Sequence, residues 1–328
     1  MEILLDSGKP FYKAQLHCHS TKSDGRLTVE EQKKLFKERG YSVVAFTDHE
    51  HLVDNSYLDD EDFLTITSCE VAIKEDPHMS TLKNRNMRAV HLNFYALNQH
   101  NVITPCYNSV YDHYTNDEVR AITRYDGEYE RVYTVECIND MIRIAKESGF
   151  LVSYNHPNWS LETAADYLQY NGLDFVEIYN HSCTMSGEDS YIIKAFDDIL
   201  RSGKRVFATM CDDSHRLERM FGGWVMINAE KLDYSTIMSS LQNGNFYSSN
   251  GPEIFSLTRD GDMVTIRTSP ARRIALSTKS RRCAVVWGDG VTEATFQVQP
   301  EDGYFRITVD DNHGYHAHTQ GYLVEEQK

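Results

Sequence analysis

The chain has 328 residues, 41% of them hydrophobic and 25% charged, and its formal net charge at pH 7 is −16. This composition supports a sizeable folded core and excludes wholesale disorder. The negative charge disfavours a protein that binds long nucleic acids, since it repels their phosphate backbone. A small anionic substrate stays open, because bound divalent cations can reverse the local field.

The apolar segments and the cysteines of the sequence indicate in which cellular compartment the protein is expected. No apolar run approaches the roughly 20 residues that span a membrane, and the segment MEILLDSGKP lacks the basic and then apolar pattern of a secretory signal. The seven cysteines are scattered and form no CxxC pair. We therefore expect reduced thiols in a cytoplasmic protein, with no membrane partner and no Cys-based zinc site. Nothing in the sequence indicates an oligomeric state.

Up to about residue 245, predicted strands and helices alternate. The first helix is expected to begin at Thr28, where Glu31 completes a capping box, and to end at Gly40. A second clear helix spans 134–148, with apolar residues at helical spacing. The other helices are predicted at 160–170, 189–201 and 235–242, and the strands at 11–18, 42–47, 63–72, 88–97, 150–154, 173–179 and 205–210.

This alternation predicts parallel strands with covering helices, arranged as a barrel over residues 1–245. Residues 98–133 interrupt it with a tyrosine-rich insertion, which we expect to contain a hairpin around an Asp126-Gly127 turn. The insertion is either a lid that recognises an aromatic or nucleoside group or a cover for the barrel edge. Its tyrosines are Tyr107, Tyr111, Tyr114, Tyr125, Tyr129 and Tyr133.

The remainder of the chain, residues 246–328, has a different pattern. It contains no helical period, only alternating strands separated by Asp-Gly dipeptides that are typical of hairpins. We predict a small antiparallel β domain packed against the barrel. Its histidines, His313, His316 and His318, have no carboxylate cluster near them in sequence and are expected at the surface.

The motif QLHCHSTKSDG carries the first chemical signal. His17 and His19 are two residues apart at the end of a strand, so both imidazoles project from one face, and Asp24 follows in the next loop. Two neutral imidazoles side by side suit a divalent metal ion. An isolated HxH pair is more often a surface feature without a ligand, so further ligands have to support this interpretation.

Such ligands recur at or near the carboxyl ends of the other predicted strands. Those ends converge on one mouth of a barrel, so residues far apart in sequence become neighbours. The coincidence predicts a single polynuclear metal site. The residues concerned are His49, Glu70, His91, His156, Asp213 and His215.

The order HxH…SDG, TDH, E, H, HP, DxH resembles the PHP (polymerase and histidinol phosphatase) superfamily over about residues 11–245. The later segment LQNGNFYSSNGPEI resembles the CehA/McbA-like metallohydrolases over a shorter stretch. The resemblance implies a distorted (β/α)7 TIM-like barrel that holds two or three Zn, Mn or Fe ions and hydrolyses phosphate esters.

Residue by residue, the resemblance implies three metal positions. The first would use His17, His19, Glu70 and Asp213; Glu70 would bridge to the second, completed by His91 and His156; the third would use Asp24, His49 and His215. Asp24 stands where several family members have a histidine. An oxygen ligand there shifts the preference toward harder ions such as Mn²⁺ or Mg²⁺.

This site implies hydrolysis without a protein nucleophile. A hydroxide shared between two cations, held through Glu70, is available at neutral pH because metal binding lowers the pKa of water to roughly 7. We expect a phosphoesterase acting on a small phosphomonoester or phosphodiester. The same hydroxide can attack a carboxyl ester, carbamate or amide, which is the first alternative. The second is a non-catalytic PHP-like module.

Several neighbours are candidates for supporting roles. Asp48 and Glu177 are expected to orient ligands rather than bind metal, and His91 is preferred over His78 as a ligand because it lies in an apolar strand. His51 or His181 could protonate the leaving group, although a solvated loop histidine is an equal interpretation. Four arginines could bind an oxyanion, namely Arg85, Arg88, Arg216 and Arg219.

Overall fold

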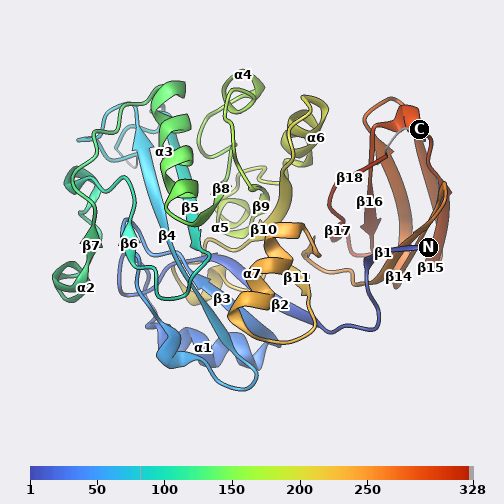
Figure 1. Ribbon diagram of the computed structural model, residues 1–328, viewed down its shortest axis with the longest axis horizontal. Coiled ribbons are helices and arrows are strands. Elements are labelled where there is room, and N and C mark those ends of the chain that lie inside the picture. The colour runs from blue at the N-terminus through green and yellow to red at the C-terminus, as the bar shows by residue number, and fades with distance from the viewer. Residues whose placement is uncertain (82, 325–328) are drawn as a thin grey trace.

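The computed structural model describes residues 1–81 and 83–324. These residues form a mixed α/β fold with one large sheet and seven α-helices (Figure 1). None of the helices in this part of the chain has both the length and the apolar character needed to cross a membrane.

Seven strands position the candidate site. Strands β2, β3 and β4 pair in parallel, and so do β8, β9 and β10. Between these two groups β5 is antiparallel to both neighbours. In sheet order the strands are β2 (Phe11–Cys18), β3 (Tyr41–Phe46), β4 (Leu64–Lys74), β5 (Ala89–Ala96), β8 (Phe150–Tyr154), β9 (Phe175–Asn180) and β10 (Phe207–Cys211).

The orientation of β5 corrects the expectation of parallel strands throughout. A parallel pair needs a crossover, usually a helix, whereas the segment between β4 and β5 has no helix among its described residues. The chain therefore turns back. As a result the amino end of β5, which carries His91, lies beside the carboxyl end of β4.

A closed barrel is not confirmed, because the pairing of the described strands forms an open path. On the other side of β2 the sheet continues antiparallel through β11 (Trp224–Asn228) and β12 (Phe246–Ser249). The ends of β10 and β2 nevertheless lie side by side. Asp213 N donates to His17 O at 2.8 Å, and His19 N donates to Ser214 O at 2.9 Å. These two bonds bring together the ligand candidates that follow β2 and β10.

The helices cover the sheet and pack on apolar clusters that include Ile138, Phe196 and Phe36. The capping box at Thr28 and the helix after Thr134 are confirmed, whereas two predicted helices are shorter. The α-helices are α1 (Val29–Glu38), α2 (Asp117–Ile122), α3 (Val135–Glu147), α4 (Ala164–Tyr167), α5 (His181–Met185), α6 (Ile193–Arg201) and α7 (Tyr234–Asn243). Short 3₁₀ turns are η1 (Ser56–Leu58), η2 (Ser109–Tyr111), η3 (Leu217–Arg219) and η4 (Pro300–Asp302).

The tyrosine-rich insertion does not contain the predicted hairpin. Its two short strands, β6 (Ile103–Thr104) and β7 (Arg124–Tyr125), pair in parallel, because η2 and α2 lie between them and return the chain to the same edge. The rings of Tyr107 and Tyr125 stack with their centroids 4.1 Å apart. The insertion therefore has secondary structure and packing of its own, and His51 and Glu50 tie it to the rest of the fold.

The C-terminal part is antiparallel, as the strand pattern predicts (Figure 1). The N-terminal strand β1 (Glu2–Leu5) also belongs to this sheet, where it pairs with β13. The division of the chain at about residue 245 stays a prediction. The remaining strands are β13 (Ile254–Asp260), β14 (Met263–Thr278), β15 (Cys283–Gln297), β16 (Tyr304–Asp310), β17 (His316–His318) and β18 (Tyr322–Leu323).

One surface expectation in this sheet is wrong. His313 is exposed, but His318 is fully buried and both of its ring nitrogens are hydrogen-bonded. The Nε2 atom lies 2.6 Å from the hydroxyl of Tyr191, and Nδ1 lies 3.0 Å from Oγ1 of Thr308. His316 is partly buried, with Nδ1 2.7 Å from a carboxylate oxygen of Asp310.

Candidate metal centre

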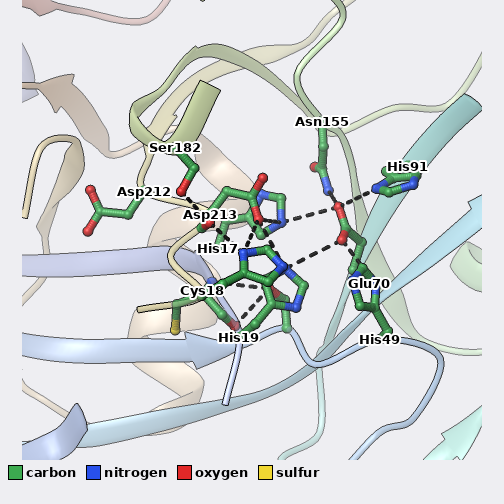
Figure 2. Close-up of polar contacts among 12 residues, drawn as sticks. His17, Cys18, His19, His49, Glu70, His91, Asn155, Ser182, Asp212 and Asp213 are labelled. Atoms are coloured by element: carbon green, nitrogen blue, oxygen red, sulfur yellow. Dashed lines mark hydrogen bonds and ion pairs between the residues drawn. The ribbon is translucent and has the colours of Figure 1, made fainter. Parts of the chain in front are cut away.

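All nine predicted ligands lie in one cluster (Figure 2 shows part of it). Their donor atoms form three overlapping groups that lie close enough to hold metal ions: His19, Asp24, His49 and His215; His17, Glu70 and His156; and His17, His19 and Asp213. His91 joins the second group, since its Nδ1 lies 3.2 Å from Oε1 of Glu70. By contrast His78, the rejected alternative, is exposed in the loop after β4.

Glu70 lies at the centre of the cluster. Its side chain projects from β4 and is 1% exposed. The Oε1 atom is within 3.3 Å of ring nitrogens of His17, His91 and His156, and Oε2 is within 3.5 Å of those of His49 and His19. One carboxylate that faces five imidazoles with its two oxygens has the geometry expected of a bridge between two ions.

The spacing of the buried donor atoms is that of ligands around a metal ion, and several of these atoms have no hydrogen-bond partner. Nε2 of His17, both ring nitrogens of His19 and Oδ1 of Asp213 are buried and have no hydrogen-bond partner. Yet Oδ1 of Asp213 lies 3.3 Å from Nε2 of His17 and 3.1 Å from Nε2 of His19. Ligands about 2.1 Å from a common cation are separated by about 3.0–3.4 Å. Since unpaired buried polar atoms are costly, a shared cation explains this arrangement.

The third group lies nearer the surface, with the carboxylate of Asp24 27% exposed. Asp24 places Oδ1 3.3 Å from Nε2 of His215 and Oδ2 3.6 Å from Nε2 of His49. Burial by itself would lower the pKa of His49, but Asp24 and Glu70 raise it to about 9. Because His49 faces Glu70 through Nδ1 and Asp24 through Nε2, it connects the third group to the central carboxylate.

The surroundings favour the metal-coordinating form of Glu70 and His91 but the protonated form of His17, whose proton a metal ion would have to displace. Burial opposes the charged form of His17, but Asp213, Glu70 and Glu177 raise its pKa well above the usual value. Burial also disfavours ionised Glu70, but His91 and His17 hold its pKa well below the usual range. Burial lowers the pKa of His91 to about 4. An ionised carboxylate and a neutral imidazole are the forms that coordinate divalent metals.

A surrounding layer of residues fixes the ligands. Glu177 accepts from Nδ1 of His17 at 3.0 Å and from the backbone N–H of His156 at 2.9 Å, as expected of an orienting residue. Asn155 donates to Glu70 at 2.8 Å, and Asn180 donates to both Glu177 and Asp213 at 3.0 and 3.2 Å. The sequence interpretation missed both asparagines, although each stands where a strand ends, the position that revealed the ligands.

Asp48 also has the supporting role expected of it. Its Oδ1 accepts from the backbone N–H of Ser20 at 2.7 Å and from the hydroxyl of Ser23 at 2.6 Å, and its Oδ2 accepts from the Ser20 hydroxyl at 2.7 Å. These bonds hold the loop between His19 and Asp24. Asp48 is therefore engaged with that loop and is turned away from the ligand groups.

Two ligand candidates have an unusual backbone. His156 has φ of 27° and Asp213 has φ of 52°, a region that L-residues with side chains rarely adopt. Residues kept in such conformations cost about 1–3 kcal/mol each and persist where the surroundings fix them. Both lie just beyond a strand end, and the turned backbone directs their side chains into the cluster.

The ligands open into a cavity of about 420 Å³. Arg216 and Arg219, two of the four arginines predicted to bind an oxyanion, line it, and Arg219 also bonds to the hydroxyl of Ser186 at 2.6 Å. Arg85 and Arg88 are not among the lining residues. Arg85 is exposed, and Arg88 pairs with Glu75 and Asp166 instead. The lining also includes two cations that the sequence interpretation did not select, Arg26 and Lys74.

Neither candidate general acid lines this cavity. His51 is buried, with Nε2 2.7 Å from Asp112 and Nδ1 2.6 Å from the hydroxyl of Thr123, so both nitrogens serve to anchor the insertion. His181 begins α5 and contacts the hydroxyl of Tyr179 through Nδ1 at 3.0 Å. The structure thus assigns His51 a structural role and places His181 outside the cavity wall.

No family model and no curated protein matches the chain. Among solved structures the chain is similar to a two-domain protein from Bacteroides vulgatus that contains a predicted PHP-like metal-dependent phosphoesterase (TM-score 0.45, 14% identity, 100% of this chain and 91% of that chain). It is also similar to a protein from Bifidobacterium adolescentis to which metal-dependent phosphoesterase activity is ascribed (TM-score 0.37, 14% identity, 63% and 89%).

A third similar structure is an amidohydrolase from Chromobacterium violaceum with bound sulfate and no metal (TM-score 0.40, 15% identity, 62% of this chain and 87% of that chain). Two of these three similar structures are thus described as metal-dependent phosphoesterases, and the first of them as PHP-like.

Proposed function

We propose that the protein is a metal-dependent hydrolase of small phosphate esters, either phosphomonoesters or phosphodiesters. The observation that carries the proposal is the convergence of eight histidine and carboxylate side chains around Glu70, with unpaired buried donor atoms. Seven of these nine residues, Glu70 included, line one cavity. We also propose that the site belongs to a (β/α)7 barrel of the PHP type and that the protein is cytoplasmic.

Different residues of the site would bind the metal ions and the phosphoryl group. His17, His19, Glu70, Asp213, His91 and His156 would hold two ions, and Asp24, His49 and His215 would hold a third. Bound divalent ions supply a water-derived nucleophile at neutral pH and neutralise the negative charge that develops on phosphate oxygens. Arg216 and Arg219 would orient the phosphoryl group from the loop after β10.

Aromatic side chains pack against three of the ligand histidines. The ring centroid of Trp159 lies 4.8 Å from those of both His91 and His156, and that of Tyr114 lies 5.4 Å from that of His49. Tyr114 belongs to the insertion and lines the cavity, which supports the lid interpretation of residues 98–133. A partly dry site strengthens the electrostatic interactions that hold an anionic group.

Parallel assays test the proposal and its two alternatives. Protein loaded with Mn²⁺ or Zn²⁺ is offered 4-nitrophenyl phosphate, bis(4-nitrophenyl) phosphate and 4-nitrophenyl acetate, with His17→Ala as the matched variant. We expect turnover of a phosphate ester that His17→Ala abolishes. Turnover of the acetate alone would indicate a carboxyl ester, carbamate or amide hydrolase. No turnover of any ester would favour a non-catalytic module.

A further inference from the structure

A buried lysine at the far end of β4 is not explained by the proposed function. In a strand, side chains at i, i+2 and i+4 share a face, and Glu70, Ala72 and Lys74 all line the cavity. Four residues along a strand span about 13 Å. The ammonium group of Lys74 therefore belongs to a part of the cavity distinct from the centre of the ligand cluster.

Lys74 is only 7% exposed, and it forms no ion pair with any carboxylate of the described residues. Its Nζ lies 5.3 Å from the ring centroid of Tyr111, a cation–π contact. Burial lowers the pKa of Lys74 more than the attraction of Glu50 raises it. A lysine this deeply buried is ordinarily paired.

The nearby carboxylate of Glu50 is already neutralised. It forms a two-pronged pair with Arg131, with Nη1 to Oε1 at 2.9 Å and Nη2 to Oε2 at 2.6 Å, and Oε1 also accepts from the backbone N–H of Ala72 at 3.1 Å. Lys74 is thus left as a cation without a protein counterion, in the wall of the cavity that holds the candidate metal ligands.

The other cations of the cavity wall lie elsewhere. Arg26 follows β2, and Arg216 and Arg219 follow β10, whose end lies beside that of β2, since Arg26 N donates to His215 O at 2.8 Å. Strand β3 separates β2 from β4, which carries Lys74. The cavity therefore presents positive charge at two places, with the ligand groups and the aromatic rings of Tyr114 and Trp159 as further parts of its wall.

We propose that Lys74 binds a second acidic group of the substrate, a carboxylate or a phosphate, while the reacting group lies at the ligand cluster. This inference rests on the proposed function and makes it narrower. The substrate is a small molecule with two acidic groups on either side of a compact, ring-sized body. Lys74 determines specificity and takes no part in bond breaking.

Matched substrates test this role. 4-Carboxyphenyl phosphate is compared with 4-carbamoylphenyl phosphate, which has the same shape and lacks the second charge. A charged hydrogen bond at a buried site gives about a tenfold or greater preference in kcat/KM for the carboxylate. We expect Lys74→Met to lower this ratio about tenfold, and Lys74→Arg to keep most of it. Comparing ratios between variants cancels the difference between the two leaving groups.

Lys194→Met, which removes an exposed cation on α6, is the control and leaves the ratio as in the unaltered protein. A ratio near one in the unaltered protein would overturn the inference. So would equal losses on both substrates in Lys74→Met, which would place Lys74 at the reacting phosphate. Thermal unfolding of each variant verifies that it is folded.

A binding measurement separates this inference from the proposed function. Isothermal titration compares the unreactive 4-carboxybenzylphosphonate with benzylphosphonate. The Kd for 4-carboxybenzylphosphonate is divided by the Kd for benzylphosphonate. We expect Lys74→Met to raise this ratio about tenfold. That result without any ester turnover would contradict the proposed function and support the role of Lys74. Turnover with an unchanged Kd ratio would overturn the role of Lys74 alone.

Discussion

The carboxylate of Glu177 accepts a hydrogen bond from Nδ1 of His17 at 3.0 Å, and both side chains are buried. Because an ionised carboxylate can only accept, the neutral, metal-binding form of His17 would carry its proton on Nδ1 and direct the lone pair of Nε2 toward the side of Glu70 and Asp213. The tautomer and orientation of a predicted ligand are thus set by a residue that does not itself face the ligand groups.

We predict that Glu177→Gln keeps the fold and weakens metal binding about 10–100-fold, because a neutral amide holds the imidazole less firmly. Competition with a fluorescent chelator measures this affinity, with the surface variant Glu147→Gln on α3 as the control. An affinity equal to that of the unaltered protein would remove Glu177 from the account of the site.

Asp24 faces only the third group, in contrast to Glu70. We therefore expect Asp24→Ala to lose one ion per chain and to retain the others, since their ligands are untouched. Elemental analysis after dialysis gives the number of ions. Loss of every ion in this variant would show that the groups do not bind independently, and no loss at all would show that Asp24 binds none.

Removal of metal should destabilise the protein. A ligand that binds only the folded state stabilises it by about 2.7 kcal/mol at a concentration 100 times its Kd. We expect the Tm of chelator-treated protein to lie several degrees below that of protein reloaded with Mn²⁺ or Zn²⁺. Differential scanning fluorimetry measures the shift in Tm. The control is chelator-treated protein in Mg²⁺-free buffer from which the chelator has been removed. Equal Tm values would contradict metal binding to the folded state.

Stability should also fall in acid because of His318, far from the metal ligands. Burial holds the pKa of His318 well below 6.5 in the folded protein. Below about pH 6.5 the unfolded chain therefore binds a proton that the folded chain does not, and the free energy of unfolding falls by up to about 1.4 kcal/mol per pH unit. Above that pH His318 is neutral in both the folded and the unfolded chain, and its titration does not change the free energy of unfolding.

His318→Gln removes this dependence. We expect the variant to be less stable than the unaltered protein at pH 7.5, because it loses the bond to Thr308 or Tyr191. The gap between the two should narrow as the pH falls from 6.5 to 5. Urea unfolding of metal-free protein at each pH measures the gap, and a gap independent of pH would refute a buried neutral imidazole.

Local patterns predicted the parts of the fold that depend on neighbours in sequence. The cap at Thr28 and the end of β2 at Cys18 lie where expected, because hydrogen bonding over three residues and the alternation of a strand are local effects. The same strand ends revealed His17 and His19, which the structure brings together with ligands up to about 200 residues away in sequence.

Features that depend on distant partners could not be predicted in this way. The sequence of β5 is equally compatible with a parallel and an antiparallel neighbour. Its direction follows from the lack of a helical crossover among the described residues between β4 and β5. The burial of His318 depends on Tyr191, 127 residues away. The role of His51 likewise depends on Asp112 and Thr123, and nothing near His51 in sequence indicates these contacts.

The central claim is that Glu70 is the carboxylate shared between the ions of one polynuclear centre. Its most direct test is elemental analysis of protein loaded with Mn²⁺ or Zn²⁺ and dialysed, for the unaltered chain and for Glu70→Ala. The account predicts two or three ions per chain in the unaltered protein and at most one in the variant, with activity lost. An unaltered protein essentially free of metal, or a variant with unchanged stoichiometry, would contradict it.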